Sequence, residues 1–238
     1  MGAKRPQTTR RISGSSASRL RLKWRKWIVA IAEDVGDQMA SFDVYKELRS
    51  IVATNPRIQQ PSYLHGWVFL NFARASTVRL RRFDDQDSRS QSLWRMLYEM
   101  LEYPGMITRR THQARYTKNR DLAALTFDNA VGRGRDCLGP GRIRQDLRRI
   151  EDSCARVRRF VNKRVAHAGA KGALRKPPTF GDLEHALEEI DSIVCYYQLL
   201  LTGSAPQTQN PTFQFDWADV LREPWLPRPT GQAEAEGT

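Results

Sequence analysis

The sequence has few of the residues that build disulfide frameworks and metal sites. Its 238 residues include three cysteines and four histidines. The cysteines are odd in number, widely spaced at Cys137, Cys154 and Cys195, and form no Cys-x-x-Cys metal motif. The acidic residues within 84–87 resemble a metal cluster, but caps at helix ends explain them more simply. We therefore expect reduced, mostly buried thiols, no metal site and no cofactor.

Long apolar runs are also missing. The longest, Trp27–Ala32, is far shorter than the roughly 18 residues that a membrane-spanning helix needs. It is shorter than the apolar core of a signal peptide, and no small-residue cleavage site accompanies it. We expect a cytoplasmic protein that makes no membrane contact.

Charge is plentiful but unevenly distributed, with a net value of +13. Residues 1–32 carry nine Lys or Arg and no acid, residues 109–179 have a net charge of +13, and residues 180–238 have a net charge of −8. This asymmetry has two interpretations. The basic middle of the chain binds an anionic partner, most simply a nucleic acid, or it pairs with the acidic C-terminal part inside one fold.

Apolar residues recur at steps of three and four along most of the chain, which predicts an all-α protein. Two regular stripes mark long amphipathic helices over 142–166 and over 180–202. Thr179 with Asp182 is typical of a cap for the second helix, and Gly203 of its end. We expect these helices to be antiparallel neighbours in a helical bundle, since a short connection joins them.

The organisation of the chain follows from composition and periodicity. Residues 1–18 read as a disordered basic tail, residues 19–203 as the helical bundle domain, and residues 204–238 as a linker, a short helix and a disordered C-terminal tail. Within the bundle, the spacing predicts one helix over 20–39 and another over 42–52.

The first of the two long helices is the strongest functional candidate. Its apolar stripe leaves a set of cationic residues on other faces, where they can bind phosphate groups: Arg148, Arg149, Arg156, Arg159 and Lys163. Arg158 adds a further charge to this predicted RNA-binding set. His167 ends the helix with Lys163 and Arg164 one turn earlier, and these cations would lower the pKa of the imidazole. A neutral His beside a cation suits metal-free RNA cleavage. The alternative is a His that only ends a helix, where it is favourable against the helix dipole.

Two stretches of the sequence, Phe160–His167 and Pro177–Leu183, resemble the HEPN superfamily, and most closely its bacterial abortive-infection branch. The segments 77–84 and 90–93 are similar to that branch as well. HEPN domains are helical bundles, commonly dimeric, and many are metal-independent ribonucleases with an Arg, four to six intervening residues and a His. His167 matches the family's His. The resemblance thus implies an HEPN-like fold, an RNA substrate, a homodimer, and an antitoxin or a nucleotidyltransferase-like protein as partner.

The sequence departs from the family's motif at the arginine. The positions that precede His167 with four, five and six intervening residues hold Asn162, Val161 and Phe160, while Arg159 has seven between and Arg164 two. The resemblance therefore implies a catalytic set of His167, Arg164, Asn162 and Arg159 with a displaced cation. Three functions remain open: an endoribonuclease of the defence or toxin type, a non-catalytic HEPN-like module that binds RNA, a nucleotide or a protein, and a plain helical interaction protein.

Overall fold

The computed structural model describes residues 13–56, 58, 63–162, 178–204 and 206–221. These residues form eight α-helices and one short 3₁₀ helix. In chain order they are α1 (Gly14–Thr54), α2 (Tyr63–Phe83), α3 (Leu93–Glu102), α4 (Arg109–Gln113), α5 (Arg120–Val131), α6 (Pro140–Ser153), α7 (Ala155–Phe160), α8 (Phe180–Thr202) and η2 (Asp219–Leu221).

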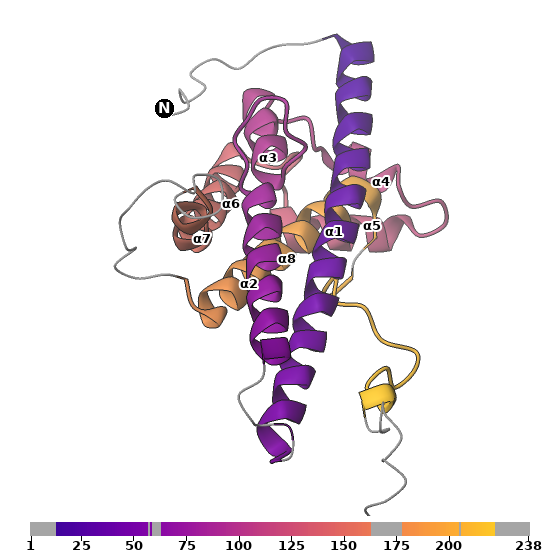
Figure 1. The fold of residues 1–238 in the computed structure, drawn as a ribbon. Coiled ribbons are helices and arrows are strands. Elements are labelled where there is room, and N and C mark those ends of the chain that lie inside the picture. Colours follow the sequence, from indigo (N-terminus) through magenta and orange to yellow (C-terminus); the bar gives the residue numbers. More distant parts are fainter. Residues whose placement is uncertain (1–12, 57, 59–62, 163–177, 205, 222–238) are drawn as a thin grey trace, which may run out of the picture.

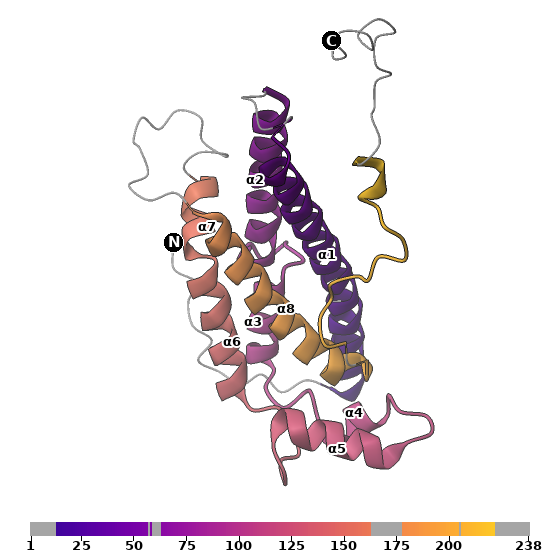
Figure 2. The same ribbon diagram turned by 90° about the horizontal axis from the view of Figure 1, so that it is seen from below.

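The helices pack as an all-α bundle around α8, which confirms the predicted fold class. In Figure 1, α1 and α2 run side by side in opposite directions. Figure 2 shows α8 between α1 and the α6–α7 pair, with α4 and α5 at one end of the molecule. The described ranges contain no strand, only an isolated bridge between Thr108 and Cys137. No helix in those ranges is long and apolar enough to cross a bilayer.

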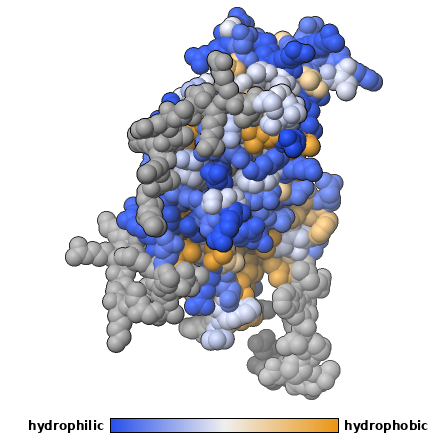
Figure 3. All heavy atoms as spheres, turned by 90° about the horizontal axis from the view of Figure 1, so that it is seen from above, coloured by the Kyte–Doolittle hydropathy of each residue, from blue (hydrophilic) through white to orange (hydrophobic). Residues whose placement is uncertain are grey.

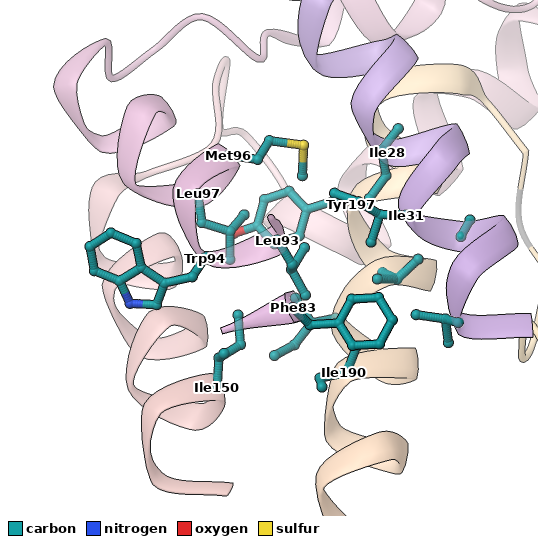
Figure 4. Packing of buried hydrophobic residues seen from close by; sticks show 14 of the residues in the cluster. Ile28, Ile31, Phe83, Leu93, Trp94, Met96, Leu97, Ile150, Ile190 and Tyr197 are labelled. Atoms are coloured by element: carbon teal, nitrogen blue, oxygen red, sulfur yellow. The ribbon is translucent and has the colours of Figure 1, made fainter. Parts of the chain in front are cut away.

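The core lies where α1, α3, α6 and α8 meet. Figure 4 shows Ile28 of α1, Leu93 of α3, Ile150 of α6 and Tyr197 of α8 converging, and each is fully buried. Burial of these apolar side chains provides the main stabilisation of the bundle.

The two tryptophans at the edge of this core keep their indole nitrogens bonded. Trp24 Nε1 donates to Glu99 Oε2 at 2.8 Å, and Trp94 Nε1 donates to Glu151 Oε1 at 2.9 Å. Each bond satisfies the only polar atom of a large side chain, so the ring can be buried without an unpaired donor.

The N-terminal helix is longer than the sequence predicted. The expected helices over 20–39 and 42–52 are one helix, α1, which starts at Gly14 behind an N-cap at Ser13, within the predicted tail. Gly36 lies inside it, where a Cβ atom would come within 2.9 Å of the Gln209 carbonyl oxygen. The glycine therefore lets the C-terminal segment cross α1 closely, and it does not break the helix.

The predicted helix over 142–166 is interrupted. It divides into α6 and α7 at Cys154, whose backbone stays in the right-handed region but departs from regular α-helical geometry, at φ −84° and ψ −4°. The axis continues nonetheless, since the Cys154 N–H bonds the Ile150 carbonyl and the Arg158 N–H bonds the Cys154 carbonyl. A π-helical turn at residues 161–162 follows α7, and the last part of the prediction, 163–166, lies outside the described residues.

The prediction for α8 is confirmed at both ends. Thr179 and Asp182 form a capping box at its start, and Gly203 ends it in the left-handed conformation at φ +81°.

The stretch over 206–210, which was expected to be a linker, is hydrogen-bonded to the bundle. Asp191 accepts from the Thr208 hydroxyl at 2.7 Å and from the Gln209 N–H at 2.8 Å.

Candidate nucleic-acid interface

The end of α7 presents two of the predicted catalytic residues to solvent. Arg159 and Asn162 are both exposed, and Arg159 Nε donates to the Ala155 carbonyl at 3.2 Å. One turn separates the two residues, so they share a side of the helix end. The other two members of the predicted catalytic set, Arg164 and His167, lie outside the described residues, as does the predicted RNA-binding residue Lys163.

Arg158 faces the opposite way, into the fold. Its Nη1 atom lies 2.6 Å from Oδ2 of Asp84, a carboxyl with no exposed surface at the end of α2. Burial raises the pKa of the Asp84 carboxyl to about 6, although the Arg158 charge opposes the shift. The other oxygen of Asp84, Oδ1, has no hydrogen-bond partner among the described residues. Arg158 thus neutralises a buried carboxylate and fixes α7 against α2.

The buried thiol of Cys154 lies beside this pair. Burial, and then the neighbouring Asp84 charge, raise the pKa of the Cys154 thiol to about 12. A thiol with such a pKa stays protonated at neutral pH and is a poor nucleophile. Cys154 is therefore part of the packing at the α6–α7 junction.

Two further predicted RNA-binding arginines pair with acids of α8. Arg149 Nε lies 2.7 Å from Glu189 Oε2, and Arg156 Nη1 lies 2.7 Å from Asp182 Oδ1. Arg156 follows Arg149 in the chain, whereas its partner Asp182 precedes Glu189. This reversed order is the pairing expected of antiparallel helices. These pairs support the second interpretation of the charge asymmetry for part of the basic segment.

Arg149 also belongs to a buried polar network that the sequence did not reveal. The carboxyl of Asp146 has no exposed surface and accepts from Arg149 Nη1 at 3.0 Å, from Arg142 Nε at 2.8 Å and from the Tyr197 hydroxyl at 3.2 Å. The aspartate sits on the apolar side of α6, between two helices. Such a carboxylate is tolerated only because three donors satisfy it.

Comparison of the chain with protein-family models, with curated proteins and with solved structures found no match. Arg148 is the predicted RNA-binding arginine of α6 that stays exposed and has no ion pair with another described residue. Arg144, one turn earlier, is exposed as well. Arg148 and Arg159 are thus the predicted cations that remain available to an anionic ligand in this part of the chain.

A groove of about 390 Å³ adjoins the end of α7. Phe160 of α7 and Phe180 of α8 line it together with Leu70 and Arg74 of α2. Further along α2, Trp67 is 53% exposed. Trp67 is exposed because α2 extends past the helices that cover its second half (Figure 1).

The most buried histidine is a structural residue. His112 has no exposed surface, and its ring nitrogens contact the Leu200 carbonyl at 3.3 Å and the Thr126 hydroxyl at 2.9 Å. Burial lowers the pKa of the imidazole, which therefore stays neutral at physiological pH. It joins α4 to α5 and α8.

Proposed function

We propose that this chain is an HEPN-like protein of the bacterial defence or toxin type that acts as a metal-independent endoribonuclease at the end of α7. The single observation that carries the proposal is the exposure of Arg159 and Asn162 beside the segment that holds His167. The neighbouring Arg156 and Arg158 are held by carboxylates, so this exposed pair is what an RNA strand would meet. An all-α bundle agrees with the fold that the resemblance implies.

The chemistry assigned to this end needs no metal. His167 accepts the proton of the attacking ribose 2′-hydroxyl, and the new bond from the 2′-oxygen to phosphorus forms. The bond between phosphorus and the 5′-oxygen breaks, and the leaving 5′-oxygen takes up the proton that the protonated His167 returns. Arg159 or Arg164 balances the negative charge that grows on the phosphoryl oxygens, and Asn162 donates a hydrogen bond that orients the phosphate. The roles of a proton carrier and a cation are thereby divided between neighbouring residues.

The test is RNA cleavage by the His167→Ala variant in the presence of EDTA. We expect cleavage to fall by about 100-fold or more, because proton transfer by a positioned side chain contributes that much. His185→Ala is the matched control, since His185 is exposed on α8 and should not alter the rate. Cleavage and host toxicity that persist unchanged in His167→Ala would refute the ribonuclease proposal.

A second candidate is a non-catalytic HEPN-like module that binds RNA. It is favoured by the motif positions, which hold Phe160, Val161 and Asn162, and by the engagement of Arg158 with Asp84. This candidate predicts salt-dependent RNA binding through Arg148 and Arg159 with no cleavage. Metal-independent cleavage that disappears in His167→Ala would eliminate it.

The proposal includes a homodimer. Tyr63, Leu64, Trp67 and Leu70 are spaced along α2 with exposed fractions between 49% and 89%, and Leu70 also lines the groove at the end of α7. An apolar helix face of this kind supports an isologous contact, which would bring two α7 ends near each other.

Sedimentation tests the dimer. We expect a wild-type dimer and a monomeric Leu64→Ser/Trp67→Ser variant, with Leu125→Ser as a control because Leu125 is exposed elsewhere, on α5. A monomeric wild-type protein would refute the homodimer. If the wild type sediments as a complex only when an antitoxin or a nucleotidyltransferase-like protein is added, that protein is the partner and the homodimer is refuted.

A further inference from the structure

Three arginines lie near the other end of α8, and none has an acidic partner among the described residues. Arg21 and Arg25 lie one turn apart on α1, and Arg115 follows α4. Figures 1 and 2 both place α4 beside the N-terminal half of α1. The charges of Arg25 and Arg21 act on Arg115 and, after its partial burial, contribute to lowering its pKa. We name these three residues the arginine cluster.

No carboxylate compensates the arginine cluster within the described ranges. None of its members takes part in an ion pair there, and the polar side-chain contact of Arg21 is a bond to the Ser18 hydroxyl at 3.1 Å. The carboxylate that contacts this part of α1, Glu99, is occupied by Lys23 at 2.8 Å and by the Trp24 indole. Residues 1–32 contain no acid at all. The local sequence therefore offers no counter-charge.

The fold holds these charges together although they repel one another. Arg25 Nε is out of contact with solvent and has no hydrogen-bond partner among the described residues. Arg115 is fixed against the end of α8, where a Cβ atom on Gly203 would lie 3.0 Å from the Arg115 Cβ. The C-terminal end of α8 contributes about half a negative elementary charge, which cannot balance three cations. Among the residues that the structure describes, no anion therefore balances the cluster.

We propose that the arginine cluster binds a phosphate group of a single-stranded RNA backbone. Guanidinium groups bind phosphate oxygens through paired hydrogen bonds, and three of them around one point provide a strong site for a dianion or a phosphodiester. Arg25 and Arg115 are partly buried at a junction between helices. A protruding phosphodiester can reach such recessed groups, whereas a flat bilayer surface cannot. Figure 3, which looks down on the end where α1 begins, shows mainly hydrophilic side chains and only small apolar patches.

This site shares its ligand class with the proposed function and in that respect rests on it, but its residues are different. The end of α7 lies by the first turn of α8, because Arg156 pairs with Asp182. The arginine cluster lies by the last turn, because Arg115 contacts Gly203. The two proposals can therefore fail separately: loss of cleavage concerns His167, and loss of binding concerns the cluster.

The experiment measures the affinity of a fluorescent single-stranded RNA by anisotropy at several salt concentrations. All proteins are full-length and carry His167→Ala, so that the probe stays intact. The test variant is Arg21→Gln/Arg25→Gln/Arg115→Gln. The matched control is Arg79→Gln/Arg120→Gln/Arg133→Gln, which removes the same charge from exposed arginines that have no ion pair with a described residue.

We expect the cluster variant to lose about tenfold or more in affinity and the salt slope to fall by about 0.7, because the contact to one phosphate is removed. The control should lose less than about twofold. RNA should also raise the melting temperature of the parent protein more than that of the cluster variant, whose helical circular dichroism stays unchanged.

Two results would overturn the proposal. Equal losses in the cluster and control variants would mean that only net charge matters. Unchanged RNA affinity, with lost binding to vesicles of phosphatidylcholine and phosphatidylserine, would assign the cluster to a lipid headgroup instead.

Discussion

The two basic regions of this molecule differ in what surrounds their charges. In α6 and α7, Arg142, Arg149, Arg156 and Arg158 each contact a carboxylate, and two of these carboxylates are fully buried. In the arginine cluster, no described carboxylate contacts any guanidinium. The first region has the higher local charge in the sequence, yet much of that charge stabilises the bundle. A count of charged residues therefore does not locate a candidate binding surface. The ion pairs that the charged residues form, or do not form, are the better guide.

The difference has a physical cause in the register of the helices. Antiparallel packing places the acidic α8 along α6 and α7, so their charges meet in pairs. The N-terminal half of α1 contacts α3 and the apolar part of α8, which provide few acids. The variants below test this contrast.

The largest effect on stability is expected from Asp146, the buried acid that contacts two arginines of α6. Asp146→Ala leaves two arginines and the buried Tyr197 hydroxyl without their acceptor. We expect a loss of about 3–5 kcal/mol in the free energy of unfolding, as for other broken buried pairs. Urea denaturation measures it. Glu189→Ala, which removes a partly exposed partner of Arg149, should cost about 1 kcal/mol or less. A similar, small loss in both variants would contradict a structural role for the network.

The next test separates two adjacent arginines of α6. Arg149→Gln should cost about 2 kcal/mol in unfolding free energy, because Asp146 loses a donor, and should leave RNA affinity nearly unchanged. Arg148→Gln should leave the unfolding free energy unaltered and weaken RNA binding. Denaturation and anisotropy on the same preparations give both values. If Arg149→Gln weakened binding more than Arg148→Gln, pairing would be a poor guide to the binding surface.

A pH test addresses the buried pair of α7. The folded pKa of Asp84, about 6, lies above the value of 3.8 of an unperturbed carboxyl. Between these values the folded state holds more protons, so the contribution of Asp84 to stability is greatest at low pH and is lost as the pH rises through 6. From pH 5 to pH 7.5 the wild type should lose about 1 kcal/mol relative to Asp84→Asn.

Asp87→Asn is the control for this measurement. The hydrogen bonds from Arg89 hold the pKa of Asp87 at about 2, so its contribution does not change in that pH range. The same pH dependence in the wild type and in Asp84→Asn would show that the Asp84 carboxyl is already ionised at pH 5.

The smallest expected effect is an increase in stability. Arg115→Gln relieves repulsion within the arginine cluster while keeping most of the side-chain stem, so it should stabilise the ligand-free protein by a few tenths of a kcal/mol. Thermal unfolding at low and high salt measures it, since salt screens the repulsion. Arg109→Gln, in the same segment, should instead lower the melting temperature because it breaks the 2.6 Å pair with Asp128. A destabilised Arg115→Gln protein would indicate an unrecognised counter-charge.

The parts of the fold that depend on neighbouring residues could be predicted from the sequence. The Thr179–Asp182 cap, the end of α8 at Gly203 and the antiparallel packing of its apolar stripe all follow from spacings of a few residues. The interruption at Cys154 could not be predicted, since the apolar spacing runs through it unchanged. The continuity of α1 through residues 40–41, between the two helices that were predicted, could not be predicted either; there the Ser41 hydroxyl donates to the Asp37 carbonyl within the helix.

The candidate site was predictable to a smaller extent. Arg159 and Asn162 are exposed where the helical spacing would put them. The burial of Arg158 in an ion pair, in contrast, depends on Asp84, which is 74 residues away in the sequence. The arginine cluster likewise joins residues of α1 with one that follows α4. Charge pairing over such separations is decided by tertiary packing, which composition and periodicity do not contain.

The length of α8 has a consequence for the size of the ligand. Its 23 residues correspond to a rod of about 34 Å, with the end of α7 at one terminus and the arginine cluster at the other. A stacked strand advances about 3.4 Å per nucleotide, so about ten nucleotides are needed to touch both ends of one protomer. Shorter oligonucleotides reach only one end at a time. Under the two proposals above, α8 sets the distance between the two RNA contacts, and RNA length, independent of base sequence, then determines how tightly a strand is held.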